Sequence, residues 1–277
     1  MDTQVARQLQ QFLEEDVGLG DITTDSVFGP QQEGQAIFVA KEDFVVAGLN
    51  EIVPLVFTTR NPLIICTALK KDGETARSGE RIFSAQGPVR DLLSAERVAL
   101  NLAQRLSGIA TLTAAFVHEV EGLPVRIIDT RKTTPGLRAL EKYAVRIGGG
   151  HNHRFSLADG ILLKDNHIAA AGSISEAVRL IRDKAPHTLK IEVETENLAQ
   201  VAECLACGVE IIMLDNMAPA LMRQAVNFIA GRALVEASGG VNLSNVREIA
   251  EAGVDLISVG ALTHSARAMD ISMRLSG

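Results

Sequence analysis

Asp129-Thr130-Arg131-Lys132 directly follows an apolar run at residues 125–128, and Lys164-Asp165-Asn166-His167 directly follows the next run at 160–163. The same order recurs downstream, with apolar runs at residues 189–193, 210–214, 233–237 and 255–259. Segments rich in Ala, Leu and Glu lie between most of these runs. Strands that alternate with helices predict a parallel sheet, and six such units favour a closed β/α barrel over an open sheet. A seventh strand is expected if residues 145–153 contain one.

The six runs end in residues of different chemical kinds. The first two ends are cationic, the next two are acidic (Glu194-Thr195 and Asp215-Asn216), and the last two are rich in glycine (Ser238-Gly239-Gly240 and Gly260-Ala261). The C-terminal ends of barrel strands converge on one mouth, where the active site of such a fold lies. Ordinary loop polarity does not explain this sorting, so the sequence predicts a mouth that binds a ligand with several parts.

The kinds of residue indicate what those parts are. Arginine grips carboxylates and phosphates by two-point hydrogen bonding, and lysine binds them as a point charge. Glu194 and Asp215 can accept hydrogen bonds from sugar hydroxyls or hold Mg²⁺ together with phosphates. The glycine-rich ends offer backbone N–H groups to a phosphate. The cationic candidates are Arg131, Lys132, His153, Arg154 and Lys164.

Composition narrows the class of protein. The chain has 277 residues, enough for one large or two modest domains, and 47% of them are hydrophobic and 22% charged. Its net charge of -7 argues against general nucleic-acid binding, yet three of its six histidines lie between residues 129 and 167. A local basic cluster in an acidic protein indicates a focused site for a small anion.

Redox and targeting signals are sparse. Cys204 and Cys207 form a C-x-x-C at the end of a predicted helix, and zinc would need further ligands, so two packing residues are favoured over a metal or redox site. Residues 1–4 carry no signal-peptide pattern, and no apolar run approaches the roughly 18 residues of a membrane helix. A reducing, cytoplasmic location is expected.

The N-terminal part predicts a small mixed α/β layer. An amphipathic helix is expected over residues 2–15, a turn-rich loop over 14–25, and a long helix beginning near Asp91 or Ser94, either of which can cap it. Arg97 shares a face of that helix with Asn101 and Arg105, which by itself indicates a solvated face. Short strands are expected at residues 35–40, 44–48, 63–67 and 81–85, with a helix near 50–56.

Several motifs together resemble the quinolinate phosphoribosyltransferase family. Thr130-Arg131-Lys132-Thr133-Thr134-Pro135-Gly136 is one, and the stretch Gly148-Gly149-Gly150-His151-Asn152-His153-Arg154 is another. Further matches lie at residues 163–167, 15–24, 96–101 and 107–111. The resemblance spans nearly the whole chain, in the right order, and is far more specific than a single short motif.

The resemblance implies a two-domain subunit. An N-terminal α/β sandwich is expected at residues 1–110, a seven-stranded, incomplete β/α barrel at 111–264, and a segment that returns to the first domain at 265–277. The family works as a homodimer, sometimes a higher assembly, in which one subunit closes the partner's barrel mouth. Arg97 is then expected to reach the partner's site and help hold a quinolinate carboxylate.

The resemblance also implies roles for the strand ends. Arg131, His153, Arg154 and Lys164 match the other quinolinate contacts. Lys132 matches a lysine near the reacting centre and the phosphates of phosphoribosyl pyrophosphate. Glu194 and Asp215 match an acidic pair at the ribose and Mg²⁺, the metal being held directly, through water or through substrate. The region around the 5-phosphate of phosphoribosyl pyrophosphate is matched by Ser238, Gly239, Gly240, Gly260, Ala261 and His264.

The implied reaction joins quinolinate to phosphoribosyl pyrophosphate and yields nicotinate mononucleotide, pyrophosphate and CO₂, a step of NAD biosynthesis. Lys132 is a hypothesis for a group that helps at decarboxylation. Three alternatives stay open: a related phosphoribosyltransferase (for nicotinate, or of the molybdenum-linked branch), a Schiff-base aldolase with Lys164 as nucleophile, and a non-catalytic ligand-binding protein. Borohydride trapping would reveal the aldolase.

Overall fold

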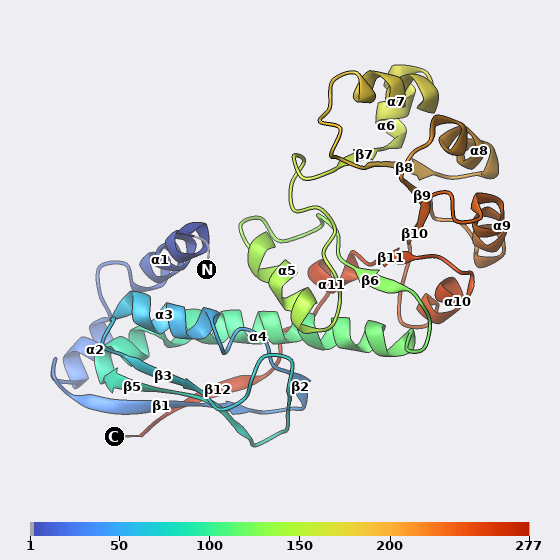
Figure 1. Cartoon of the computed structure of the whole chain (residues 1–277). Helices are drawn as coiled ribbons and strands as arrows, with labels where there is room; N and C mark the ends of the chain where they lie inside the picture. Colours follow the sequence, from blue (N-terminus) through green and yellow to red (C-terminus); the bar gives the residue numbers. More distant parts are fainter. Residues whose placement is uncertain (1–2, 277) are drawn as a thin grey trace. The chain divides into compact units, whose positions relative to one another are not determined.

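The structure is a computed structural model that describes residues 3–276. The chain forms two compact units (Figure 1). The first comprises the residues up to Ala114, residues Thr134–Gly149 and those from Ala266 on, and the second comprises Ala115–Thr133 and Gly150–Ser265. The predicted helix start at Asp2 and the outer bounds predicted for the domains, residues 1 and 277, lie outside the described residues.

An antiparallel sheet forms the centre of the first unit. Its strand order is β12 (Ile271–Ser276), β1 (Glu33–Ala40), β5 (Arg81–Pro88) and β3 (Ile65–Ala68). A short ladder joins β2 (Phe44–Val45) to β4 (Thr75–Ala76). Because β1 pairs with β12 from Gln35 to Ala40, the last strand of the chain completes the sheet that the first strand begins.

Helices bury the apolar side chains of this sheet. Phe38 of β1 and Phe83 of β5 lie 5.3 Å apart between ring centroids, and Phe57 of α3 (Ile52–Arg60) stacks on Phe83 at 5.9 Å. Aromatic contacts at these distances stabilise the fold by more than the burial of apolar area alone. The other helices of this part of the chain are α1 (Thr3–Val17), α2 (Ile22–Val27), α4 (Val89–Glu119) and α5 (Arg138–Ile147).

Two details of this unit differ from the sequence-based expectation. The predicted loop over residues 14–25 is interrupted by α2, whose N-terminus is capped by Asp21. The long helix α4 begins at Val89, so Asp91 and Ser94 lie inside it and do not cap it. Asp91 is used elsewhere, since it forms an ion pair with Arg60 at 2.9 Å and accepts a hydrogen bond from Asn61.

The second unit is built on a parallel sheet. Within residues 3–276 it has six strands, and each predicted apolar run forms one of them. In sheet order they are β6 (Arg126–Ile128), β11 (Leu256–Ser258), β10 (Leu234–Ser238), β9 (Ile211–Asp215), β8 (Ile191–Thr195) and β7 (Ile161–Leu163). Between them lie α6 (Asp165–Ala171), α7 (Ile174–Arg182), α8 (Leu198–Cys207), α9 (Pro219–Ile229) and α10 (Val246–Glu251), with α11 (Ala261–His264) after the last.

The barrel is incomplete on one side. β6 pairs with β11, and on its other side the described residues show a single bridge between Ile128 and His151. The possible seventh strand at residues 145–153 is reduced to this bridge, because residues 145–147 are the end of α5 and Gly149 at φ +88° turns the chain out of the helix. The predicted fold class, an incomplete β/α barrel with an N-terminal α/β unit, is confirmed.

Side-chain hydrogen bonds place α5 in the first unit. Arg105 donates to the fully buried carboxylate of Glu141 at 2.7 Å, and Tyr143 donates to Asp72. Arg105 is thus engaged within its own unit, whereas Arg97 on the same helix is exposed.

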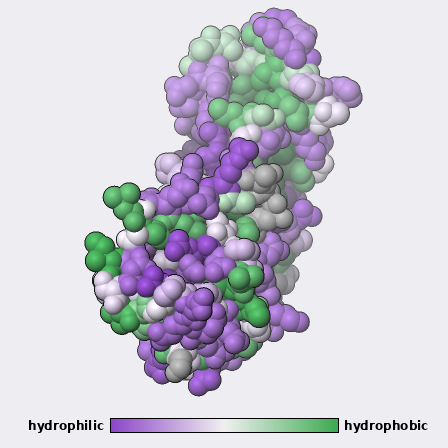
Figure 2. Space-filling model, turned by 90° about the vertical axis from the view of Figure 1, so that its left-hand side faces the viewer, coloured by the Kyte–Doolittle hydropathy of each residue, from purple (hydrophilic) through white to green (hydrophobic). Residues whose placement is uncertain are grey.

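The surface is mixed in polarity. Leu19, Ile22 and Leu63 are exposed apolar residues, and Figure 2 shows hydrophobic residues in small groups among hydrophilic ones on the face it presents. No helix within residues 3–276 combines the length and apolar character that crossing a membrane requires. The C-x-x-C lies where the sequence predicts, at the end of α8, with Cys204 fully buried and Gly208 as the left-handed C-cap.

Candidate active site

A pocket of about 450 Å³ opens at the C-terminal ends of the barrel strands. Side chains alternate between the two faces of a strand, so residues two apart on β8, β9 and β10 point to the same side. The ladders set Glu194 of β8 beside Met213, and Asp215 of β9 beside Ser238 of β10. Three consecutive strands therefore bring their last inward residues to one wall of the pocket.

Most of the predicted site residues come together here. They comprise five cationic or histidine side chains, the two predicted acids, and the glycine-rich end of β10. These residues are Arg131, Lys132, His153, Arg154, Lys164, Glu194, Asp215, Ser238, Gly239 and Gly240.

Four predicted residues are not among those that line the pocket. Arg97 is exposed on α4 in the first unit. Gly260, Ala261 and His264 belong to the turn and short helix after β11. Gly260 is nevertheless close to the site, because a Cβ added there would lie 3.1 Å from Cδ of Lys132 and 3.2 Å from Nε2 of His264.

A buried aspartate holds the cationic segments in place. Asp129, fully buried after β6, accepts hydrogen bonds from the backbone N–H of His153 at 2.9 Å and from the amide of Asn152 at 2.6 Å. Thr263 fixes the neighbouring loop, since its hydroxyl donates to the carbonyl of Lys132 at 2.8 Å. Asp129 is thus the residue that ties the 151–154 segment to the strand end carrying Arg131.

The guanidinium groups of Arg131 and Arg154 both line the cationic half. Burial, and then the neighbouring Arg131, lowers the pKa of Arg154. Arg154 is anchored by one N–H, which donates to the carbonyl of Gly160 at 2.7 Å. Like charges brought together in a half-buried pocket destabilise each other until an anion binds between them, so this half is suited to a ligand with more than one negative charge.

The acidic pair is held by polar neighbours. Nζ of Lys164 lies 2.6 Å from Oε2 of Glu194, and the amide of Asn216 donates to Asp215 at 2.7 Å. Mg²⁺ is commonly bound through one or two carboxylates plus substrate phosphates. Two half-buried carboxylates on adjacent strands supply the oxygen donors that such a site needs, so the residues present fit the predicted metal.

The glycine-rich end of β10 is shaped by an asparagine. Asn216 has the unusual φ of +53°, and its N–H donates to the carbonyl of Ser238 at 2.9 Å. A Cβ on Gly239 would lie 2.2 Å from the side-chain oxygen of Asn216. Glycine at this position therefore permits the asparagine to pack against the backbone that lines the pocket.

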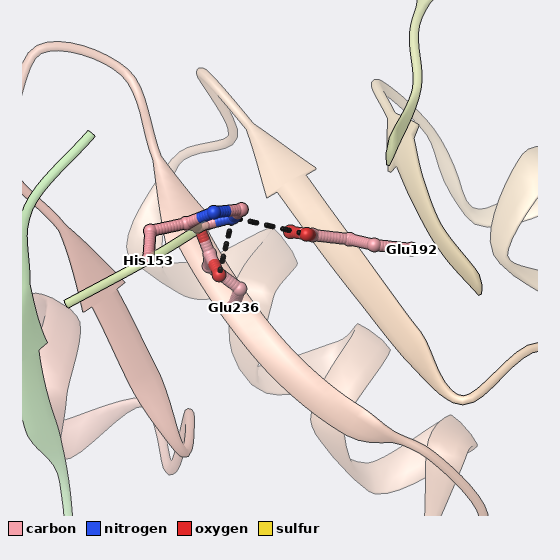
Figure 3. Close-up of side chains that lie close together, drawn as sticks. All are labelled: His153, Glu192 and Glu236. Atoms are coloured by element: carbon pink, nitrogen blue, oxygen red, sulfur yellow. Dashed lines mark hydrogen bonds and ion pairs between the residues drawn. The ribbon is translucent and has the colours of Figure 1, made fainter. Parts of the chain in front are cut away.

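His153 of the cationic half forms a polar cluster with Glu192 and Glu236, both buried (Figure 3). Nε2 of His153 is 3.0 Å from Oε2 of Glu192 and 3.9 Å from Oε2 of Glu236, and all the candidate ligand atoms lie within 4.8 Å of one another. Glu192 and Glu236 are 4% and 1% exposed. Burial, and then the charge of Glu192, raises the pKa of Glu236 well above its ordinary value.

Sequence reasoning did not select Glu192, Glu236 or Asn216. The two glutamates lie inside apolar runs that predict strands, so they were interpreted as strand residues and not as site residues. The signal was available: strands of a parallel sheet read as nearly continuous hydrophobic runs, so a carboxylate in the middle of one is unusual. In a barrel, such a residue two positions before another polar residue faces the interior.

Comparison with known proteins identifies the chain. The sequence model of the quinolinate phosphoribosyl transferase N-terminal domain matches residues 21–107, and that of the C-terminal domain matches residues 109–274. The chain belongs to the quinolinate phosphoribosyltransferase family.

Relatives in this family cover the chain almost completely. A Bacillus subtilis (strain 168) protein named probable nicotinate-nucleotide pyrophosphorylase (carboxylating) is 47% identical, over 98% of this chain and 93% of its own. Quinolinate phosphoribosyltransferase (decarboxylating) 1 of Nicotiana glauca is 41% identical, over 96% of this chain and 81% of its own. The crystal structure of NadC from Streptococcus pyogenes superposes with a TM-score of 0.95 at 44% identity, over 99% and 96% of the two chains.

Proposed function

We propose that the protein transfers a phosphoribosyl group from phosphoribosyl pyrophosphate to quinolinate and decarboxylates the product, giving nicotinate mononucleotide, pyrophosphate and CO₂. The observation that carries this proposal is the sorting of charge around one pocket, with cations on one side and acids followed by glycines on the other. Family relatives named for this activity, similar to this chain over 93% and 81% of their own lengths, support it.

In the proposed complex, the cationic half binds the two carboxylates of quinolinate. Arg131 and Arg154 supply paired N–H donors, and Lys164 supplies a further charge at the rim. Nicotinate, with one carboxylate, would leave part of this charge uncompensated. His153 lines the same side, and Lys132 is proposed to lie between this half and the phosphates.

The other half is proposed to bind phosphoribosyl pyrophosphate. Glu194 and Asp215 accept hydrogen bonds from the ribose hydroxyls and hold Mg²⁺, which when bound would neutralise charge on the leaving pyrophosphate. The backbone of Ser238, Gly239 and Gly240 receives phosphate oxygens without obstruction by side chains. Gly260, Ala261 and His264, next to Lys132, extend this phosphate region.

The proposed chemistry follows from these positions. As pyrophosphate leaves, positive charge develops on the ribose and the two carboxylates stabilise it. The pyridine nitrogen attacks the anomeric carbon and becomes cationic. The C2 carboxylate then departs as CO₂, and the electron pair left on C2 is stabilised by the adjacent positive nitrogen.

An assay for nicotinate mononucleotide from quinolinate, with nicotinate run beside it, tests the proposal. We expect product and pyrophosphate from quinolinate in a ratio of one to one, and little product from nicotinate. Product from nicotinate alone would support the alternative substrate. Borohydride trapping of a substrate on Lys164 would support an aldolase instead, and the absence of pyrophosphate release would support a non-catalytic protein.

We also propose a cytoplasmic homodimer with shared active sites. Arg97 is an exposed arginine of the first unit and does not line the pocket of its own chain, so it is available to the pocket of a second subunit. Contribution from a second subunit would supply one more cation for quinolinate.

A further inference from the structure

The function proposed above uses His153 and leaves Glu192 and Glu236, the other two members of its buried cluster, without a role. Among residues 3–276, this cluster is the group of His, Cys, Asp or Glu side chains whose donor atoms come close enough to share a cation. One carboxylate oxygen of Glu192 and one of Glu236, both buried, have no hydrogen-bond partner within the described residues. Such groups are rare in folded proteins and call for a proton, an ion or a ligand.

The hydrogen bonds of His153 favour a proton over a metal ion within this cluster. The backbone N–H of Arg154 donates to Nδ1 of His153 at 2.7 Å. Nδ1 must therefore carry the lone pair, which puts the proton of a neutral ring on Nε2. An Nε2–H can donate to Glu192 at 3.0 Å, whereas a metal bound at Nε2 would need a lone pair there.

The proton belongs on Glu236. Two buried carboxylates this close cannot both be charged at modest cost, so one of them is neutral. Nε2 of His153 lies 3.0 Å from Glu192 and farther, at 3.9 Å, from Glu236, so the histidine can donate to Glu192 and leaves Glu236 to hold a proton of its own. Glu236 is also the more deeply buried of the two, and its pKa is raised.

Glu236 faces two cavities. It lines the pocket at the strand ends, and it also lines a cavity of about 510 Å³ at the opposite end of the strands, beside Arg126, Ile211 and Leu256. His153 lines both cavities as well, and Glu192 lines the second. A neutral acid at this position can give a proton to a ligand on one side and be reprotonated by water from the other.

Resting on the function proposed above, we propose that the neutral carboxyl group of Glu236 donates the proton that C2 of the pyridinium ring takes up as CO₂ leaves. The C2–carboxylate bond breaks, and its electron pair stays on C2. The O–H bond of Glu236 then breaks as the C2–H bond forms, which leaves Glu236 as a carboxylate. A proton from water in the second cavity restores the acid.

Other groups of the pocket are less suited to this step. Lys164 is paired with Glu194, Asp215 accepts a hydrogen bond from Asn216, and Lys132 is exposed. An ionised Glu236, which lines the same pocket as Arg131 and Arg154, would repel the carboxylates of quinolinate, whereas a neutral one does not. The same proton thus serves binding of the dianion and the later chemistry.

The test separates the two chemical steps in one variant. Glu236→Gln keeps the size and neutrality of the side chain but cannot act as an acid. In a single turnover we expect pyrophosphate release within about threefold of wild type, and CO₂ release slowed by at least roughly 100-fold, the usual lower range for loss of a general acid. Quinolinate mononucleotide should accumulate. Glu236→Asp, which retains an acid, should restore much of the CO₂ release.

Three results would overturn the proposal. The first is equal release of CO₂ and pyrophosphate by an active Glu236→Gln enzyme. The second is normal CO₂ release by Glu236→Gln from preformed quinolinate mononucleotide while Lys132→Ala is stalled, which would assign the proton to Lys132. The third is a metal retained stoichiometrically by purified wild type and lost in Glu236→Gln.

A measurement on wild type covers the case in which the variants fold poorly. Infrared spectroscopy of the protein at pH 7 should show the C=O stretch of a protonated, buried carboxylic acid, and its absence would overturn the proposal. If wild type releases no pyrophosphate from quinolinate and phosphoribosyl pyrophosphate, the proposed function itself fails. Active wild type with an unaffected Glu236→Gln removes only the inference about Glu236.

Discussion

Gly239 and Gly240 are neighbours with positive φ values, +89° and +62°, but their surroundings differ. A Cβ on Gly239 would strike the side chain of Asn216, whereas a Cβ on Gly240 would meet nothing within 4 Å. Any other residue at either position bears the cost of a left-handed conformation, about 1–2 kcal/mol. Substitution of Gly240 therefore tests backbone strain alone, whereas substitution of Gly239 tests the same strain together with displacement of the Asn216 side chain.

We predict that Gly239→Ala lowers kcat/KM for phosphoribosyl pyrophosphate at least roughly tenfold more than Gly240→Ala does. The reason is that only the Gly239 substitution displaces Asn216, whose side-chain amide donates a hydrogen bond to Asp215. Both variants should lose similar stability from strain. Steady-state kinetics and thermal unfolding of the two variants check this. Equal kinetic effects would mean that the position of Asn216 is unimportant for binding.

At the scale of elements, α4 packs against the returning C-terminal segment through a glycine. A Cβ on Gly108, in mid-helix, would lie 1.9 Å from the carbonyl oxygen of Arg267, which is backbone and cannot rotate away. Nearby, the N–H of Met269 donates to the carbonyl of Gln104 at 3.0 Å. The close approach of the two backbones depends on the missing side chain.

Gly108→Ala should destabilise the protein. The substitution adds about 1 kcal/mol of helix propensity, but overpacking of this kind costs about 1–3 kcal/mol and here requires movement of backbone. We expect a net loss of about 1–2 kcal/mol in the free energy of unfolding, measured by urea denaturation. Gly29→Ala is the control, since its Cβ has open space, and a gain in stability from Gly108→Ala would contradict the packing argument.

The same segment is fastened by an ion pair. Both guanidinium N–H groups of Arg267 donate to Glu42, at 2.8 and 2.5 Å, and the backbone N–H of Asp270 donates to it at 2.9 Å. The hydrogen bonds from Arg267, and then the one from Asp270, lower the pKa of Glu42 to about 2. A carboxyl with a depressed pKa stabilises the fold above its unfolded pKa and loses that contribution as pH falls toward the folded one.

Glu42→Gln should therefore reduce stability at pH 7, and the difference from wild type should shrink as pH falls from about 4.5 toward about 2. Urea denaturation at a series of pH values measures this, with Arg267→Gln as the matched partner variant. Because the pair is partly exposed, the effect is small and weakens with salt. A difference that stays constant across this window would show that Glu42 acts through packing alone.

At the scale of the whole molecule, the proposed shared site makes a prediction about mixtures. Arg97→Ala and Lys164→Ala should each be nearly inactive as homodimers, since each lacks a cation for quinolinate. In a mixed dimer, one of the two pockets has wild-type residues at both positions. After random exchange of subunits, activity should recover to roughly a quarter of wild type, because half of the dimers are mixed and each has one good site.

A tag on one variant shows whether the subunits have exchanged, since the untagged variant then purifies together with the tagged one. No recovery after verified exchange would remove Arg97 from the partner's site. The dimer itself would then be tested separately by its mass in solution.

The sequence predicted the fold well where periodicity was unambiguous. Six apolar runs with polar ends became six strands, and their ends carry most of the residues around the pocket. The possible seventh strand at residues 145–153 is reduced to the bridge at His151, because residues 145–147 belong to α5 and Val145 is buried as part of that helix. A short apolar stretch does not distinguish the two structures by itself.

The site was less fully predictable than the fold. The cations at the strand ends directly follow apolar runs and precede turns, so the sequence pattern was enough to predict them as site residues. Glu236 was hidden in the run 233–237 because its importance depends on Glu192 and His153, which lie far from it in sequence. The role of Asp129 as the anchor of the 151–154 segment likewise depends on a contact that no local pattern contains.

The strand orders have a consequence for folding. β6 pairs with β11, and β1 pairs with β12, so each of these pairs joins segments that lie far apart in the sequence. A pairing of this kind forms only after a long loop of the chain has closed, and contacts that form later must offset the entropy lost in that closure. Folding of each unit is therefore expected to be slow, and β1 and β6 stay open to the strands of other molecules until their distant partners arrive.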